Sequence, residues 1–253
     1  MNYNWNWGIF LEASPDGTGS YLYTLFLGTR WTIAVSLTAW VAALVMGGVV
    51  GTLTTLPRRG WAMLGDAYIE FFRNIPLLVQ MFLWFFVVPE IVPEAIGTWM
   101  KQTPNSSFWT AVVALAFFTS TRIAVQFRAG ILSQARGQMM AAQALGMTLT
   151  QSYCYVILPM AFRIILPPLT SEFMNILKNS SVAMAVGLME LTAQTRAMQE
   201  FSFQVFEAFT VSTIIYIVIN MVIVFGMRRL ERWLAVPGFS FDRGAEADLR
   251  GGA

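Results

Sequence analysis

The stretch GQMMAAQALGMTLTQSYCYVILP, residues 137–159, joins an alanine-rich polar segment to an apolar run that ends in Leu158-Pro159. Residues 139–145 are mostly good helix formers, and Gly146 is the residue type that ends a helix with a positive φ. This pattern predicts a short helix that stops at Gly146. Its small side chains allow another protein to close around it, although an ordinary alanine-rich surface helix has the same composition. The surrounding chain decides between these two interpretations.

The composition is that of a membrane protein. Hydrophobic residues make up 56% of the chain and charged residues only 12%, against about 25% charged residues in soluble domains. The 16 Lys and Arg residues nearly balance the 14 Asp and Glu residues, so the chain has no basic field for nucleic acid. Cys154 is the single cysteine and there is no histidine, which leaves no internal disulfide and no pattern typical of a catalytic or metal site.

Three uncharged stretches are long enough to cross a membrane, which takes about 20 residues. They are the 27 residues between Arg30 and Arg58, the 20 from Gln102 to Thr121 and the 20 from Ala208 to Met227. A fourth apolar stretch, residues 67–88, is predicted to bend at residues 73–76, because a proline disfavours helix at the residue before it. The stretch from Arg163 to Glu190 is predicted to be one passage broken at Pro167-Pro168. The sequence therefore predicts an all-α integral membrane protein with about five spans.

Charge bias predicts the orientation of these spans. Positively charged residues concentrate in the loop at Arg58-Arg59, in residues 128–163 and after Arg228. By the positive-inside tendency the amino terminus faces outward and the carboxyl terminus lies in the cytoplasm. Residues 1–24 are expected to form an extracytoplasmic segment with Trp5, Trp7, Tyr21 and Tyr23 at the outer headgroups, and residues 233–253 a cytoplasmic tail. The first span must act as the insertion signal, since no cleavable signal peptide is evident.

The chain lacks the loop that cradles nucleotide phosphates. Its two lysines, Lys101 and Lys178, do not follow a glycine as in the Gly-x-x-x-x-Gly-Lys pattern. Uphill transport by this chain would therefore need ATP bound and hydrolysed by a separate subunit, and the chain itself is predicted to carry no cofactor and to be no enzyme. No internal repeat is evident, so a two-fold pathway would need a second chain.

Four motifs in order resemble the permeases of polar amino-acid ABC importers, over residues 25–232. Residues 141–159 match the family's coupling-loop spacing, with Met140 where the family usually has Glu. Residues 72–80 resemble Phe-Arg-x-x-Pro-Leu-Leu-Val-Gln, residues 128–138 resemble the Arg-Gly-Gly-Ile and Gly-Gln elements, and residues 158–181 resemble Leu-Pro-x-Ala-x-Arg followed by Lys-x-Ser-Ser. Residues 4–11 and 122–128 narrow the resemblance to glutamate/aspartate importer permeases.

The resemblance implies a type-1 ABC importer permease fold with a cytoplasmic coupling helix. It implies two cytoplasmic ABC ATPase subunits, a second and related permease, and an extracytoplasmic solute-binding protein, in a bacterial inner membrane. The residues expected to couple to the ATPase are Gln138, Met140, Ala141, Ala142, Gly146, Leu158 and Pro159. Because Met140 replaces the acidic residue, this contact is expected to depend on shape more than on charge.

Arg122 is the leading candidate for the substrate pathway. If its span enters near Phe108, Arg122 lies about 21 Å deep in a core about 30 Å thick. It either faces the pathway and pairs with a substrate carboxylate, or it pairs with Glu172 or reaches the inner headgroups. Glu172 is expected to balance Arg122 or Lys178, and Arg73 to fix a bend near the inner surface.

A second set of pathway candidates follows the two prolines. Lys178, Asn179 and Ser180 either line the pathway, at the start of a new helix, or merely cap that helix. Gln126, one turn from Arg122, is a further pathway candidate.

Acidic amino acids are the predicted substrates, with neutral or basic amino acids as the alternative. A secondary transporter or channel is a less favoured function, and an intramembrane enzyme the least favoured.

Overall fold

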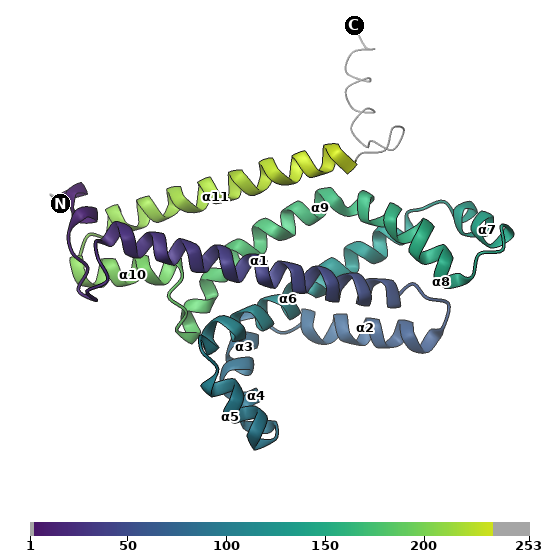
Figure 1. Ribbon diagram of the computed structural model, residues 1–253, viewed down its shortest axis with the longest axis horizontal. Helices are drawn as coiled ribbons and strands as arrows, with labels where there is room; N and C mark the ends of the chain where they lie inside the picture. The colour runs from purple at the N-terminus through teal and green to yellow at the C-terminus, as the bar shows by residue number, and fades with distance from the viewer. Residues whose placement is uncertain (1–2, 235–253) are drawn as a thin grey trace, which may run out of the picture.

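The computed structural model describes residues 3–234, and these form helices joined by short loops (Figure 1). The longer helices are α1 (Tyr21–Leu53), α2 (Arg59–Arg73), α6 (Ser106–Leu132), α9 (Leu158–Asn179), α10 (Leu191–Ser202) and α11 (Val205–Leu234). The shorter helices are α3 (Leu77–Phe82), α4 (Val88–Ile91), α5 (Glu94–Gln102), α7 (Arg136–Ala144) and α8 (Leu149–Ser152). Turns of 3-10 helix lie at Trp7–Leu11 and Ser180–Val186, and π-helical turns at Leu83–Val87 and Tyr153–Ile157. Of the predicted tail at 233–253, residues 235–253 lie outside the described residues.

Four helical stretches are long and apolar enough to cross a membrane, and a bent pair brings the total to five. The four are Tyr21–Leu53, Ser106–Leu132, Leu149–Val186 and Val205–Leu234, and the pair is Arg59–Arg73 with Leu77–Ile91, bent by 98°. This confirms the prediction of about five spans in an all-helical chain. The limits differ from the predicted ones in both directions, because α1 begins at Tyr21, before Arg30, and ends at Leu53, before Arg58, while α6 begins at Ser106 and continues to Leu132.

The predicted bend at residues 73–76 is present. The break frees backbone carbonyls, and the buried side chain of Gln80 donates from Nε2 to the carbonyls of Phe72 at 2.9 Å and Ile75 at 3.1 Å. Arg73 ends α2, whose first residue, Arg59, follows the loop after α1. Arg73 therefore lies at the bend, about 21 Å along that helix; its expected place near the inner surface stays a prediction.

The predicted break at Pro167-Pro168 is wrong, because α9 runs without interruption from Leu158 to Asn179. Each proline removes only one backbone hydrogen bond, and both prolines lie on the exposed face of the helix. On the opposite face, Ile165, Leu166 and Leu169 are buried. Packing of that face outweighs the two lost hydrogen bonds.

The centre of the bundle is a close contact between α1 and α6. A Cβ atom on Gly47 would lie 2.6 Å from Cγ2 of Ile123, and one on Gly51 would lie 2.6 Å from the carbonyl oxygen of Ala124. Real Cβ atoms do not approach so closely, so these glycines let the two backbones meet. These glycines therefore serve the packing of α1 on α6.

The amino-terminal segment and α10 lie at one end of the molecule, and α7 and α8 lie at the other (Figure 1). Glu207, in the first turn of α11, holds the amino-terminal segment by accepting from Asn6 N at 2.7 Å and from the hydroxyl of Tyr3. Trp5 and Trp7 remain exposed, but Tyr21 is buried against Leu25 and Leu191. Tyr21 is thus a packing residue of α1, contrary to its predicted position among headgroups.

Candidate functional site

The helix predicted around Ala141 is α7, and it ends as the sequence predicts. Gly146 has φ +81, and the backbone N–H groups of Gly146 and Met147 donate to the carbonyls of Gln143 at 2.9 Å and Ala142 at 3.1 Å. This pair of hydrogen bonds is a Schellman motif, which needs a residue that tolerates a left-handed backbone. Gly146 therefore fixes where α7 stops.

Buried contacts seat α7 and α8 against the spans. Ile131, Ile157 and Ala161 form a small core against which Met139 and Leu158 pack. Gln134, just before α7, donates from Nε2 to the carbonyl of Ile157 at 2.9 Å. These contacts connect α7 to the ends of α6 and α9.

A polar contact joins the same region to α1. The hydroxyl of Tyr153 donates to the carbonyl of Thr55, just beyond α1, at 2.8 Å. Thr148 caps α8 by accepting from Gln151 N at 3.3 Å, while the Gln151 side chain accepts from Thr148 N at 2.8 Å. A displacement of α7 and α8 would therefore be passed to three spans.

The exposed side of α7 is uncharged among its placed side chains. Met140 is 62% exposed and Leu145 is 82% exposed, and Ala141 and Gly146 are exposed beside them. These four residues are called the α7 surface below. Leu145 was missed by sequence reasoning, although an apolar residue directly before the terminating glycine was a signal for it.

Three predicted coupling residues take other positions. Ala142 is only 4% exposed and faces its own chain, so a direct contact with a partner is not available to it. Gln138 is partly buried, with Oε1 lacking a hydrogen-bond partner. Leu158 packs on the small core and, with the exposed Pro159, begins α9.

Three of the predicted pathway residues lie together, between α6 and α9. Nη1 of Arg122 is 3.8 Å from Oε2 of Glu172, and Nε2 of Gln126 donates to Oε1 of Glu172 at 3.4 Å. The Arg122 guanidinium also lies over the ring of Phe118, with Cζ 4.9 Å from its centroid, an arrangement that attracts a cation to the ring face. The predicted pairing of Arg122 with Glu172 is confirmed.

A cavity of about 410 Å³ opens beside this group. It is lined by Arg73, Phe118, Thr121, Arg122, Val125 and Gln126. Arg122 lies about 24 Å along α6 from Ser106, so the cavity is at mid-span. Two guanidinium groups therefore line one cavity within the membrane-spanning part, and sequence reasoning missed Arg73 because it assigned that residue to the bend.

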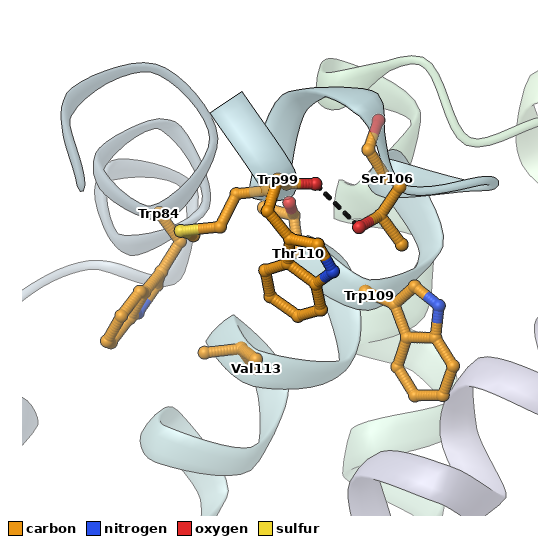
Figure 2. A pocket seen from close by; sticks show the side chains of 8 residues that line it. Trp84, Trp99, Ser106, Trp109, Thr110 and Val113 are labelled. Carbon is orange, nitrogen blue, oxygen red and sulfur yellow. Dashed lines mark hydrogen bonds between the residues drawn. The ribbon is translucent and has the colours of Figure 1, made fainter. Parts of the chain in front are cut away.

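A second cavity, of about 520 Å³, is apolar. Figure 2 shows three tryptophan side chains around it, Trp84, Trp99 and Trp109, together with Thr110 and Val113. None of its lining residues is charged, so it offers a charged ligand no counter-ion. The cavity beside Arg122 is the better candidate for a charged substrate.

Lys178, Asn179 and Ser180 lie elsewhere. Lys178 lines a separate groove with Tyr216, Asn220 and other residues of α11. The three residues stand at the carboxyl end of α9, where Ser180 Oγ donates to the carbonyl of Leu177 at 2.7 Å. A helix carboxyl end presents carbonyls, so the predicted set of donors for an anion at a new helix start is not formed.

Glu190 is a buried carboxylate that sequence reasoning did not single out. It caps α10 by accepting from the backbone N–H groups of Thr192 at 2.9 Å and Ala193 at 2.8 Å, and it accepts from the Tyr216 hydroxyl at 3.0 Å. Burial raises the pKa of Glu190 above its ordinary value, although these hydrogen bonds oppose the rise. Its position directly before an amphipathic stretch was the signal for a helix cap.

The sequence matches a known family over residues 42–236. That family is described as "Binding-protein-dependent transport system inner membrane component". The chain is 44% identical over 241 residues to the "Glutamate/aspartate import permease protein GltJ" of Escherichia coli strain K12, covering 94% of this chain and 98% of that protein. It is 34% identical over 207 residues to the "Probable glutamine ABC transporter permease protein GlnM" of Bacillus subtilis strain 168, covering 82% of this chain and 91% of that protein.

A solved structure has the same fold. The chain matches a chain of the "Crystal structure of an amino acid ABC transporter with histidines" with a TM-score of 0.70 and 29% identity, covering 84% of this chain and 94% of that chain. The expected type-1 importer permease fold is thereby confirmed. In this fold the Gly137–Pro159 stretch forms most of α7 and the connection from α6 to α9.

Proposed function

Because this chain belongs to the family of binding-protein-dependent transport system inner membrane components, we propose that it is the permease subunit of an ATP-driven importer of acidic amino acids. The observation that carries the substrate assignment is the Arg122 guanidinium at a mid-span cavity. A guanidinium is the group that pairs most readily with a carboxylate. The 44% identity to a glutamate/aspartate import permease supports the same substrates.

The orientation follows from charge. The loop from α1 to α2, the end of α6 and the end of α11 lie at the same end of the bundle as α7 (Figure 1), and these segments hold Arg58, Arg59, Arg128, Arg228 and Arg229. The positive-inside tendency then puts this end in the cytoplasm. Residues 1–24 form the extracytoplasmic segment, residues 25–232 the membrane domain and residues 233–253 the cytoplasmic tail.

The partners are two ABC ATPases, a second permease and a solute-binding protein. The chain has no phosphate-binding loop, so the ATPases bind ATP, and the α7 surface offers them an apolar contact. A second, homologous permease completes a two-fold pathway that one chain without an internal repeat does not supply. The solute-binding protein delivers substrate at the opposite end, where the amino-terminal segment and α10 lie.

Transport requires that the position of α7 and the access to the mid-span cavity change together. When ATP binding draws the ATPases together, they displace α7. The Tyr153 and Gln134 hydrogen bonds pass this displacement to α1, α6 and α9. Since Arg122 is on α6 and Glu172 on α9, a relative shift of these helices changes access to the cavity. Both ATP and the loaded binding protein must favour the same state for import to be coupled.

Neutral or basic amino acids are the alternative substrates. The 34% identity to a probable glutamine permease favours a neutral substrate. The cavity disfavours a basic substrate, because its additional cation would be repelled by the two guanidinium groups that line the cavity. Selectivity also depends on the binding protein, so the whole importer must be tested.

The proposal is tested by reconstituting the complete importer in vesicles with its binding protein. ATP is placed on the side of the ATPases, and uptake of labelled glutamate and aspartate is measured with glutamine and arginine as competitors. The expected result is uptake that needs ATP and the binding protein and that only the acidic amino acids inhibit. Uptake driven by an ion gradient without the ATPases would instead identify a secondary transporter, and preferred uptake of glutamine or arginine would overturn the acidic assignment.

A further inference from the structure

With the orientation proposed above, the apolar cavity of about 520 Å³ in Figure 2 begins at the outer headgroups of the membrane; it is called the tryptophan cavity below. Because α6 ends next to α7 on the cytoplasmic side, it begins, at Ser106, on the outer side. Its 27 residues are about 40 Å long, whereas the hydrocarbon core is about 30 Å thick. The first turn of α6, with Ser106 and Trp109, therefore lies at the level where tryptophan is enriched. Val113, at the inner end of the cavity, lies about 10 Å along the helix from Ser106.

One wall of the tryptophan cavity is fixed by a close contact between α4 and α5. A Cβ atom on Gly97 of α5 would lie 2.1 Å from the carbonyl oxygen of Pro89 on α4, so the backbones of these two short helices pack directly against each other. Trp99 on α5 and Trp109 on α6 nevertheless stay 66% and 50% exposed. The cavity is therefore a preformed apolar surface that a molecule outside this chain can reach.

A smaller cavity, of about 240 Å³, adjoins the tryptophan cavity and shares Met100, Ser106 and Thr110 with it. Glu90 and Lys101 also line this smaller cavity, and Nζ of Lys101 lies 2.6 Å from Oε1 of Glu90. Both side chains are exposed. An ammonium group has three donors and a carboxylate has two acceptor oxygens, so each can bind a further charged group while the pair stays intact. The tryptophan cavity thus leads directly to one cation and one anion.

This arrangement complements a phospholipid whose zwitterionic headgroup can donate hydrogen bonds. An acyl chain supplies the packing contacts that the apolar walls forfeit when the cavity is empty. Phosphatidylethanolamine carries a phosphate, which a lysine binds, and a primary ammonium group, from which a carboxylate accepts. Phosphatidylglycerol carries only the anion, which Glu90 would repel. Phosphatidylcholine has a quaternary ammonium group, which has no N–H to donate to Glu90.

We infer that the two cavities together bind one phosphatidylethanolamine molecule of the outer leaflet, with an acyl chain between α5 and α6, the phosphate at Lys101 and the ammonium group at Glu90. The bound lipid fills the space between α5 and α6 and holds α5 in position. This site is separate from the cavity beside Arg122. Only the choice of the outer leaflet rests on the proposed orientation, and the lipid contacts do not depend on the transported substrate.

The test uses the purified complete importer in detergent, freed of bound lipid. The probe is a phosphatidylethanolamine with a photoactivatable group in its acyl chain, and mass spectrometry of the cleaved protein locates the label. Label is expected within residues 99–113, which include the lining residues of α5 and α6. Unlabelled phosphatidylethanolamine, phosphatidylglycerol and phosphatidylcholine with the same acyl chains compete with the probe. Phosphatidylethanolamine is expected to bind about tenfold more tightly than either other lipid, the effect of one hydrogen bond between charged groups.

Variants at the ion pair test the headgroup contacts. Lys101→Gln is expected to weaken phosphatidylethanolamine binding about tenfold, because the phosphate loses its cation. Glu90→Gln is expected to weaken it similarly and also to strengthen phosphatidylglycerol binding, because the repelling carboxylate is gone; a merely structural defect would not strengthen the binding of any lipid. The matched control is Arg196→Gln, which breaks the exposed ion pair of Arg196 with Glu200 on α10. Its lipid affinities are expected to stay within about twofold of the wild type.

Trp99→Ala tests the apolar wall and is expected to weaken phosphatidylethanolamine binding about tenfold through lost contact with the acyl chain. Trp61→Ala is the control, because Trp61 is exposed on α2 and lines neither cavity. The inference is overturned if residues 99–113 carry no label, as when the second permease covers the cavity, or if the three lipids compete equally. It is also overturned if Lys101→Gln and Glu90→Gln importers with normal ATP hydrolysis keep the wild-type affinity for phosphatidylethanolamine. Failure of the proposed function has a different signature, since the importer then takes up neither glutamate nor aspartate with ATP, whichever lipid it binds.

Discussion

The guanidinium of Arg122 on α6 lies 3.8 Å from the carboxylate of Glu172 on α9. The two residues are 50 positions apart in the sequence and come from different spans. At this separation the pair makes no direct hydrogen bond, so the guanidinium keeps donors for another carboxylate. The pair therefore forms a contact between two spans, and under the proposed function a substrate carboxylate replaces it.

Replacing Arg122 tests its role in transport. In Arg122→Ala, the half-saturation concentration for glutamate uptake is expected to rise about tenfold or more, because a charged hydrogen-bond donor to the substrate is lost. Binding of the ATPases is expected to be normal, since α7 follows the carboxyl end of α6, which lies about 15 Å along the helix from Arg122. Uptake assays and co-purification measure the two properties. Unchanged glutamate uptake would remove Arg122 from the substrate site, and Arg30→Ala is the matched control.

Close packing of α1 on α6 predicts different effects at adjacent glycines. A Cβ on Gly47 would lie 2.8 Å from the carbonyl oxygen of Ser120, whereas one on Gly48 would lie 3.4 Å from Cζ of Phe127. Gly47→Ala is expected to destabilise the bundle by about 1–3 kcal/mol through overpacking, and Gly48→Ala to have little effect. Thermal unfolding of the purified complex compares them. Equal midpoints for the two variants would contradict the close contact.

Glu190 predicts a pH dependence of stability. Because burial raises its pKa from the ordinary value of 4.5, the folded chain holds this proton more tightly than the unfolded chain. The contribution to unfolding free energy is present at low pH and is lost as the pH rises through the folded pKa. The thermal midpoint of Glu190→Gln, which has no carboxyl proton to lose, is expected to lack this component. A wild-type midpoint that follows pH just as that variant does would refute the assignment.

Local patterns in the sequence were sufficient for much of the fold. Gly146 needs a left-handed backbone and Pro76 excludes helix before it, so the end of α7 and the bend after α2 were predictable from single residues. The two prolines Pro167-Pro168 led to the wrong prediction of a helix break, because the strength of packing around Ile165 and Leu169 is a tertiary property. The burial of Ala142 and the position of Arg73 beside Arg122 likewise depend on contacts between elements distant in sequence, and no local pattern encodes them.

The central claim is that movement of separate ATPases reaches the cavity through α7, and its most direct test is the number of glutamate molecules imported per ATP hydrolysed. Ala141 is exposed on α7, and Thr150 is exposed on the adjoining α8. Ala141→Trp is expected to lower this ratio about tenfold or more, because overpacking at the contact costs about 1–3 kcal/mol. Thr150→Trp, the control, is expected to stay within about twofold of the wild type. An Ala141→Trp importer with the wild-type ratio would contradict the claim that α7 transmits the ATPase movement.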